Sequence, residues 1–296
     1  QTLEREKPDM LLVLGDREEA MTTATLGTYM NIPVAHISGG DKSGTIDDQI
    51  RHSITKLAHL HFATNIDSYE RILKLGEEKW RVFNVGNPGL DRLLEIPFMN
   101  DQVLSQKIGI SINNNEKLIL VIQHSVSNEL EDSYKQMKIT LEAVSSFNLN
   151  TIIIYPNSDA GSKKIIKAIR DFEKPKNLKL IKNLPRDEFV NIFRRASCVV
   201  GNSSAGILEA SLLKRPVVNI GTRQTGRLTS ENIQNVNHSK EQISIAIKKA
   251  LFDSEYIKNI EKCSTPYGKG DSSKKIVEII SKFINDKRLL DKEITY

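Results

Sequence analysis

Residues 39–61 of the chain read GGDKSGTIDDQIRHSITKLAHLH, and the rest of the sequence is organised around this stretch. Its paired glycines predict a turn, and a helical pattern begins a few residues later. Apolar residues recur at helical spacing and predict one buried stripe, formed by Ile50, Ile54 and Leu57. The stretch therefore predicts a glycine turn that leads into an amphipathic helix.

The start of the same predicted helix is crowded with charged residues. Asp47 lies four residues before Arg51, and Asp48 lies one turn before both Arg51 and His52. Thr45, with Asp48 three residues later, predicts an N-cap. A solvated helix with ordinary ion pairs fits this spacing, and so does an anion-handling active site behind a glycine turn. The residues alone leave both interpretations open.

Short aliphatic segments alternate with helical segments on both sides of this stretch. Because these segments lack a polar face, they predict parallel sheets that are covered on both sides. The sequence therefore predicts an α/β fold with two doubly wound, Rossmann-like domains facing a cleft. The predicted strands are residues 10–14, 33–37, 61–64 and 81–85, followed by 118–122, 151–155, 178–181, 197–200 and 216–220.

The break in this alternation gives the domain boundaries. Residues 1–95 predict a partial N-terminal Rossmann-like domain that carries the catalytic carboxylates, and residues 96–116 are polar and irregular, as in a linker. Residues 117–270 predict a second, nucleotide-binding Rossmann-like domain, and 271–296 predict a helix that packs back on the first domain. Since the first domain offers about four strands and opens on a helix-like stretch, we expect it to be incomplete at its N-terminus.

Composition narrows the classes of function. The chain has 296 residues and a net charge of +5, without the runs of like charge that mark nucleic-acid or membrane-binding arms. This balance fits an anionic small molecule. Cys198 and Cys263 stand in unrelated contexts, so we expect neither a disulfide framework nor a zinc cluster. Aliphatic runs are strand-sized and no signal-peptide pattern opens the chain. We therefore expect a cytoplasmic protein that needs no metal or cofactor.

Polar clusters follow several predicted strands, where ligands bind in open α/β sheets. The most specific is residues 201–206, GNSSAG, which lead into a helix. Backbone N–H groups and serine hydroxyls there can converge on an anion, although a plain serine N-cap also fits. The other clusters are Asp16-Arg17, residues 38–41 and residues 123–125.

Single side chains near these clusters have two interpretations each. Glu209, one turn into the following helix, fits a ribose diol or a carboxylate that complements the helix dipole. Arg223 and Arg227 fit a diphosphate or solvated loop arginines. His124 fits a catalytic group or a structural hydrogen-bonding group. The remaining histidines of the strands read as structural: His36, His59 and His61.

These clusters resemble the hydrolysing UDP-N-acetylglucosamine 2-epimerase family, on the two-domain scaffold shared with GT-B glycosyltransferases. The block GTIDDQIRHSITKLAH is the most specific and is similar to the sialic-acid-biosynthesis type. The similarity runs from residue 8 to about residue 251 and does not cover the family's N-terminal segment. The other matching stretches are GDREEA, HISGGD, FNVGNPGLD, the QH at 123–124, GNSSAGILEA and VVNIGTRQTGR.

The resemblance implies a two-step reaction. A base removes the proton at C2 of a nucleotide-linked N-acetylhexosamine while the nucleoside diphosphate leaves C1, which gives a 2-acetamidoglycal. Water then adds across the double bond and releases free N-acetylmannosamine. Such chemistry needs carboxylates near C2 and an anion cradle for the leaving group.

The resemblance also implies roles for individual residues. The catalytic set is Asp16, Asp47, Asp48 in support, Arg51 orienting the carboxylate, and His124 at the departing diphosphate. The substrate-binding set is Arg17, Ser38 and Asp41 near the sugar, Ser203, Ser204 and Gly206 at the phosphate, Glu209 at the ribose and Arg223 at the diphosphate. The implied partner is a nucleotide sugar such as UDP-N-acetylglucosamine, and relatives suggest a homodimer or homotetramer.

One departure from the family pattern bears on the mechanism. Many relatives carry a catalytic glutamate where this chain has Ser38. A serine hydroxyl cannot take a proton from a carbon acid, so that role would fall on Asp16, Asp47 or Asp41.

Other functions remain open from the sequence. The same chemistry can act on a UDP- or GDP-linked 2,4-diacetamido-trideoxyhexose in a legionaminic-type pathway. A GT-B glycosyltransferase would need an acceptor pocket and would leave Asp47 and Arg51 without a role in proton transfer. A nucleotide-sugar-binding remnant without turnover would keep only the cradle at 201–206.

Overall fold

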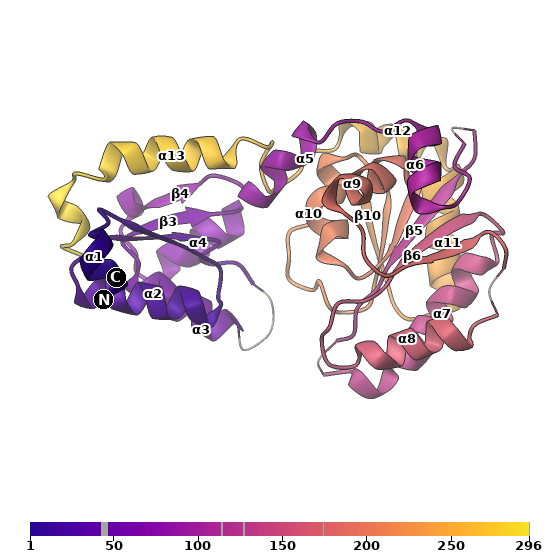
Figure 1. Cartoon of the computed structure of the whole chain (residues 1–296), viewed down its shortest axis with the longest axis horizontal. Helices are drawn as coiled ribbons and strands as arrows, with labels where there is room; N and C mark the ends of the chain where they lie inside the picture. The colour runs from indigo at the N-terminus through magenta and orange to yellow at the C-terminus, as the bar shows by residue number, and fades with distance from the viewer. Residues whose placement is uncertain (43–46, 114, 127, 174, 296) are drawn as a thin grey trace. The chain divides into compact units, whose positions relative to one another are not determined.

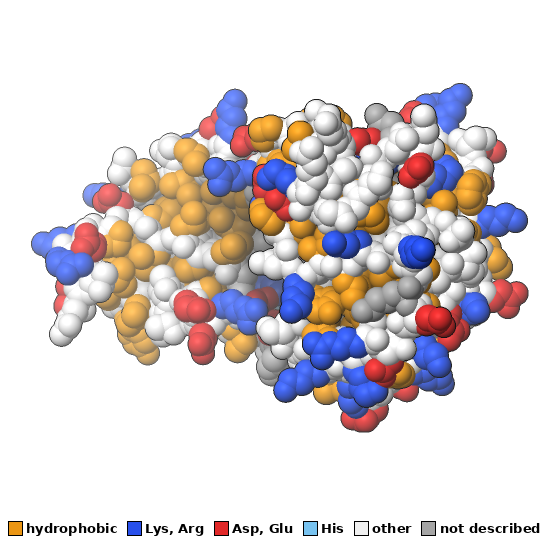
Figure 2. Space-filling model, turned by 45° about the vertical axis from the view of Figure 1, so that its right-hand side comes forward, with side chains coloured by type: hydrophobic (Ala, Val, Ile, Leu, Met, Phe, Trp, Pro, Cys, Tyr) orange, Lys and Arg blue, Asp and Glu red, His pale blue; other side chains and the backbone are white. Residues whose placement is uncertain are grey.

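The computed structural model describes residues 1–42, 47–113, 115–126, 128–173 and 175–295, and it divides into two units (Figure 1). Unit 1 comprises Gln1–Leu94, Gly226–Leu228 and Pro266–Tyr296, and unit 2 comprises Glu95–Thr225 and Thr229–Thr265. The predicted N-cap at Thr45 lies outside the described residues. Within the described residues, no helix combines the length and apolarity needed to cross a membrane. On the face shown in Figure 2, acidic and basic side chains are interspersed.

Unit 1 is built on a parallel sheet with the strand order β1-β2-β3-β4. Its register pairs Leu14 with Ile37 and Ile37 with Phe62, so that the carboxyl ends of the first three strands lie side by side. The strands are β1 (Leu11–Leu14), β2 (Val34–Ile37), β3 (Leu60–Ala63) and β4 (Val82–Asn84). The helices are α1 (Thr2–Glu6), α2 (Glu18–Tyr29), α3 (Asp47–Leu57), α4 (Ile66–Lys74), α5 (Asp91–Glu95) and α13 (Ser272–Phe283), with 3-10 turns at Lys79–Arg81, Pro88–Leu90 and Lys287–Leu289.

Helices cover the two faces of this sheet with separate apolar clusters. On one face α2 and α3 pack on β1 and β2, with Ala24 and Ile54 fully buried. On the other face the C-terminal helix α13 packs through Ile276 against a cluster that includes Phe62. Burial of these side chains is the main stabilising term in such a unit. Unit 1 is therefore closed by residues from both ends of the chain.

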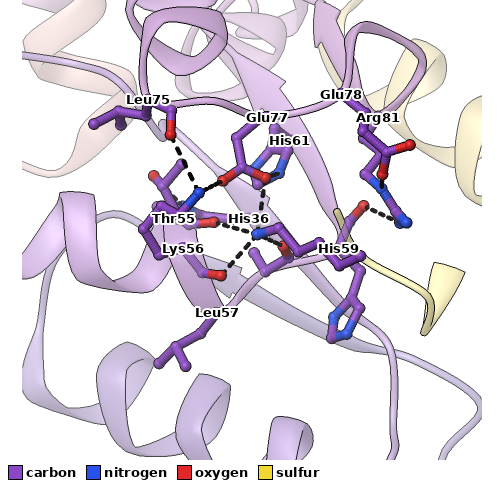
Figure 3. A network of polar contacts seen from close by, with 12 residues as sticks. His36, Thr55, Lys56, Leu57, His59, His61, Leu75, Glu77, Glu78 and Arg81 are labelled. Carbon is purple, nitrogen blue, oxygen red and sulfur yellow. Dashed lines mark hydrogen bonds and ion pairs between the residues drawn. The ribbon is translucent and has the colours of Figure 1, made fainter. Parts of the chain in front are cut away.

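A buried polar network fastens the C-terminal segment to unit 1. Glu77, whose side chain is fully buried, binds Lys56 Nζ at 2.8 Å and lies 2.9 Å from His61 Nε2 (Figure 3). Lys292 adds a further ion pair to Glu77 at 2.8 Å and donates to the carbonyls of Thr55, Lys56 and Ala58. A lysine at the C-terminus of α3 also complements the helix dipole.

Unit 2 is built on a parallel sheet with the strand order β10-β9-β8-β5-β6-β7. Its strands are β5 (Leu118–Ile122), β6 (Asn150–Ile154), β7 (Leu178–Ile181), β8 (Cys198–Gly201), β9 (Val217–Ile220) and β10 (Ile233–Val236). Its helices are α6 (Asp101–Ile108), α7 (Ser133–Ser145), α8 (Ser162–Asp171), α9 (Arg186–Arg195), α10 (Ser204–Leu212), α11 (Lys240–Phe252) and α12 (Ser254–Lys262), with a 3-10 turn at Leu130–Asp132.

Two elements differ from the sequence-based expectation. Residues 96–116 are predicted to be irregular, but they contain α6, which is capped by the side chain of Asn100 and ends at Gly109 with φ of 67°. The helix was not predicted because only Leu104 and Ile108 of α6 are buried, so its sequence lacks a clear apolar stripe at helical spacing. Strand β10 is also absent from the prediction, since its residues Ile233–Val236 are partly exposed at the edge of the sheet.

Candidate active site

In unit 1, a buried arginine gathers the candidate catalytic residues. Arg51 lies on α3, and its side chain is 7% exposed. Its Nη2 pairs with the Asp16 carboxylate, and its Nη1 donates to Asp48 Oδ1 at 2.7 Å. The same Nη1 donates to the Asp41 carbonyl at 2.7 Å. One guanidinium therefore joins the turn after β1, the turn after β2 and the start of α3.

The charges in this cluster explain why it can be buried. A lone buried guanidinium is unfavourable, and two carboxylates compensate Arg51. Asp16 and Asp48 are themselves 18% and 20% exposed, so both keep one side toward solvent or a ligand. Arg51 thereby fixes the position of both carboxylates.

Asp41 is a carboxylate of a different kind. Its Oδ1 accepts hydrogen bonds from Thr64 Oγ1 at 2.6 Å and Ser68 Oγ at 2.7 Å. Burial raises the pKa of Asp41, and these hydrogen bonds and the charges of Arg51 and Arg227 only partly oppose the rise. Asp41 therefore holds a proton more readily than an exposed aspartate does.

The other candidates of unit 1 lie on the same three segments. Asp47 is the first residue of α3, one turn before Arg51, where a carboxylate complements the helix dipole. Arg17 adjoins Asp16 and is exposed. Ser38 has φ of 65°, a left-handed conformation that is uncommon for a residue with a side chain, and its N–H donates to Phe62 O at 3.0 Å. Such backbone outliers concentrate at functional sites.

His36 contacts two of the segments that carry this cluster. Its Nε2 lies 2.8 Å from Gly15 O, next to Asp16, and its Nδ1 lies 3.3 Å from Thr55 Oγ1 on α3. Burial lowers the pKa of His36 to about 3, so that the ring is neutral. His36 thus connects the turn that holds Asp16 to the helix that holds Arg51.

In unit 2, His124 follows β5 and is held at three points. Its backbone N–H donates to Asn202 Oδ1 at 2.7 Å, and Asn202 Nδ2 donates to its carbonyl at 2.9 Å. The N–H of Asn157 donates to His124 Nδ1 at 3.2 Å, which places the proton of the neutral ring on Nε2. Burial and the nearby charge of Arg223 lower the pKa of His124 to about 4. Near neutral pH it is therefore a neutral hydrogen-bond donor.

The predicted anion cradle lies between β8 and α10. Ser203 is the N-cap and accepts from Ala205 N at 3.3 Å, Ser204 is the first helical residue, and Gly206 packs against β9. The N–H dipoles at the start of a helix favour an anion. Gly201 has φ of 134°, and a Cβ there would lie 2.1 Å from Ile122 O, so a glycine is required where β8 approaches β5.

The loop after β9 is tied to the same turn. Arg223 Nη1 donates to Asn202 O at 3.2 Å, and Gln224 Nε2 donates to the same oxygen at 2.8 Å. Because the charge of Arg223 acts on His124, these two side chains are electrostatically coupled. Asn202 therefore contacts His124, Arg223 and Gln224. The sequence analysis includes Asn202 only as part of the GNSSAG cluster and does not predict this role.

Glu209 lies on α10, and its side chain is 13% exposed. Its Oε1 pairs with Arg186 Nη1 at 2.9 Å, and Oε2 is buried without a partner among the described residues. Burial raises the pKa of Glu209, and Arg186 opposes this. Sequence reasoning missed Arg186, because it lies on another helix, far from Glu209 along the chain.

Among the described residues, no group of three or more histidine, cysteine and acidic side chains is arranged to hold a metal ion.

Solved structures share this fold. The UDP-GlcNAc 2-epimerase from Neisseria meningitidis, whose crystal structure contains UDP-GlcNAc, superposes with a TM-score of 0.80. The two sequences are 22% identical, and the match covers 95% of this chain and 78% of that one. The predicted α/β fold with two parallel sheets of GT-B type is thereby confirmed.

Curated relatives give higher sequence identity. A hydrolysing UDP-N,N'-diacetylbacillosamine 2-epimerase from Legionella pneumophila is 33% identical over 292 residues, which cover 99% of this chain and 76% of the relative. The polysialic acid biosynthesis protein P7 from Escherichia coli is 32% identical, covering 94% of this chain and 71% of that protein. The sequence model described as UDP-N-acetylglucosamine 2-epimerase matches residues 1–281. The resemblance read from the motifs is confirmed, and the chain belongs to the UDP-N-acetylglucosamine 2-epimerase family.

Proposed function

We propose that the chain is a hydrolysing epimerase that converts UDP-N-acetylglucosamine and water to N-acetylmannosamine and UDP. The observation that carries this proposal is the cluster in unit 1, in which Arg51 binds Asp16 and Asp48 beside the backbone of Asp41. Removal of a proton from carbon needs a carboxylate base at a fixed position, and delivery of a proton to the other face needs a second acid. This cluster offers both.

The first step is an elimination. Asp16 or Asp47 takes the C2 proton, the C1–O bond to the diphosphate breaks, and a C1–C2 double bond forms. The second step adds water, with hydroxide bonding to C1 and a proton returning to C2 on the opposite face. Asp41 suits the donor role, because burial raises its pKa and it therefore holds a proton more readily. Ser38 serves only as a hydrogen-bonding group in this scheme.

The leaving group is a nucleoside diphosphate, and unit 2 carries groups that suit it. His124 donates from Nε2 as a neutral ring. The N–H groups at the start of α10 and the hydroxyls of Ser203 and Ser204 donate hydrogen bonds to the phosphate oxygens, and Arg223 adds a cation. Glu209 accepts from the ribose. Arg17 contacts the sugar, and Gly206 lets α10 start close to β9.

A second substrate has specific support. The Legionella relative is named for UDP-N,N'-diacetylbacillosamine, a 2,4-diacetamido sugar that undergoes the same C2 chemistry. The E. coli relative is named for polysialic acid biosynthesis, which supports N-acetylmannosamine as the product and a sialic-acid-type pathway as its destination. The residues described above act at C1, C2 and the nucleotide, so they suit either sugar.

Incubation in heavy water tests the proposal. The chain is given UDP-N-acetylglucosamine, and the products are identified by NMR and mass spectrometry, with UDP-N,N'-diacetylbacillosamine in a parallel reaction. We expect UDP and free N-acetylmannosamine with deuterium at C2. Nucleotide-linked epimer with deuterium at C2 and no free sugar would indicate a non-hydrolysing epimerase. Binding of UDP without any exchange at C2 would indicate a nucleotide-sugar-binding protein and contradict the proposal.

A further inference from the structure

An ion pair connects the start of α9 to the second turn of α10. Arg186 is the first residue of α9, which follows β7, and Glu209 lies on α10, which follows β8. Arg186 Nη1 lies 2.9 Å from Glu209 Oε1. The arginine side chain is 49% exposed and the glutamate side chain 13% exposed. The pair therefore has a buried acidic end and an accessible basic end.

The two carboxylate oxygens of Glu209 have different surroundings. Oε1 accepts from Arg186, whereas Oε2 is buried and has no donor among the described residues. Buried acceptors in folded proteins nearly always find a donor, and those left without one call for an explanation such as a ligand. A hydroxyl of a bound ribose is a donor of the right kind, since an ionised carboxylate can only accept.

We propose that Arg186 is a positioning residue that keeps Glu209 ionised and turned so that Oε2 accepts a ribose hydroxyl. This inference rests on the proposed function, because it requires a nucleotide on unit 2. Arg186 itself contacts Glu209 and lies with its guanidinium 5.6 Å from the ring centre of Phe189, one turn further along its own helix. That contact holds the guanidinium in place from one side.

The charge balance supports this role. Burial alone raises the pKa of Glu209, and a protonated glutamic acid would present a hydroxyl that competes with the ribose for the same position. Among the described residues, Arg186 is the one charged side chain that acts on the pKa of Glu209. Removing the charge of Arg186 should therefore raise the pKa of Glu209 toward neutral pH. Replacing Arg186 by lysine keeps the positive charge and loses the planar guanidinium with its paired N–H donors.

Calorimetric titration with UDP between pH 5.5 and 8.5 tests the proposal, using the unmodified chain and the R186M, R186K and E209Q variants. We expect R186M to bind UDP about tenfold more weakly at pH 5.5, the effect of losing one hydrogen bond to a charged group, and to regain most of the loss at pH 8.5. R186K should stay within about threefold of the unmodified chain at each pH. E209Q should be weak at every pH, and it corrects for titration of the phosphate itself.

A second probe, 2'-deoxy-UDP, checks that the ribose is the group concerned. We expect the unmodified chain to prefer UDP over 2'-deoxy-UDP about tenfold, and R186M at pH 5.5 and E209Q to show less than about threefold preference. An R186M pH profile parallel to that of the unmodified chain would overturn the inference and leave the proposed function intact. Failure of the unmodified chain to bind UDP at any pH would overturn both.

Discussion

At the scale of single residues, Arg51 is the group on which the candidate site of unit 1 depends. It binds Asp16 and Asp48 through different nitrogens and reaches the Asp41 carbonyl, so three segments share one buried cation. Asp47 lies at the first position of α3, and the two ion pairs of Arg51 described above are made with other carboxylates. This difference predicts different consequences for the carboxylates. Loss of Asp16 or Asp48 removes compensation for Arg51, whereas loss of Asp47 leaves those two ion pairs in place.

Asp47→Asn is therefore the cleaner test of proton transfer. We expect exchange at C2 of UDP-N-acetylglucosamine in heavy water to fall about 10²- to 10⁴-fold, the usual contribution of a positioned acid or base. UDP affinity should stay within about twofold, because unit 2 binds the nucleotide in the proposed scheme. Glu18→Gln, an exposed carboxylate in the first turn of α2, is the control and should change neither quantity. Loss of UDP binding in Asp47→Asn would show a structural role instead.

His124 gives a prediction about pH. Its pKa is lowered to about 4, so the ring is neutral throughout pH 5.5 to 8.5 and its titration should not appear in the rate profile. The ring binds a proton only as the pH falls to about 4. Activity that depends on the neutral ring should therefore decrease on acidification toward that pH. His124→Ala should lower kcat about 10- to 100-fold through the lost hydrogen bond.

His124→Gln is the matched variant, since its amide nitrogen can replace the Nε2 donor. We expect it to recover most of the kcat lost in His124→Ala, measured as UDP release in a coupled assay. A group that works as a protonated acid would not be rescued by glutamine. An inflection near pH 6.5 that disappears in both variants would also contradict the neutral-donor role.

At the scale of elements, the sheets were predictable because most of their strands are predominantly apolar. β2, β3, β5 and β8 are buried along their whole length, and this is the pattern from which parallel sheets were predicted. β10 and α6 were not predictable, because each is half exposed and its burial depends on neighbours far along the chain. Strand order was equally hidden, since β5 pairs with β8 and β6 through contacts that periodicity does not encode.

The same limit applies to the site. The turn residues at strand ends were predictable from the fold, because ligands bind at that edge. The partners that orient them were not. Thr64 and Ser68 hold Asp41, and Asn157 holds His124, yet each lies on a different element with no motif to mark it.

The close approach of β8 to its parallel neighbour β5 gives the element-scale prediction. Gly201→Ala would place a methyl group 2.1 Å from Ile122 O at φ of 134°, and neither backbone can move without breaking the ladder. We expect a loss on the order of 3 kcal/mol or more in the free energy of unfolding, measured by urea titration with far-UV circular dichroism.

Gly206→Ala is the control for this prediction. Gly206 has ordinary helical geometry, and its added Cβ would lie 3.2 Å from Val217 Cγ1, a tight contact with a side chain. Alanine also favours a helix by about 1 kcal/mol over glycine, so the two effects should roughly cancel. Equal destabilisation by both substitutions would show that crowding at the start of α10, rather than the approach of the strands, determines the cost.

At the scale of the whole molecule, the chain passes from unit 1 to unit 2 and returns, so that unit 1 is completed by the last thirty or so residues. Arg81 donates to the carbonyls of Arg288, Leu289 and Asp291, and Lys292 binds Glu77. Stability of unit 1 should therefore depend on the C-terminal segment, whereas that of unit 2 should not.

Trp80, the single tryptophan of the chain, makes this dependence measurable. Its ring lies 5.8 Å from that of Phe283 on α13, so its fluorescence reports on unit 1 and the docked C-terminal segment, while circular dichroism reports on both units. Lys292→Met removes one partner of a buried ion pair, which typically costs about 3–5 kcal/mol. We expect the fluorescence transition in urea to move to lower concentration and to separate from a later dichroism transition. Lys287→Met, which changes an exposed lysine of the same segment, is the control and should leave the midpoints of both transitions unchanged. If both probes shift together in Lys292→Met, the two units unfold in one cooperative transition, which would contradict the prediction.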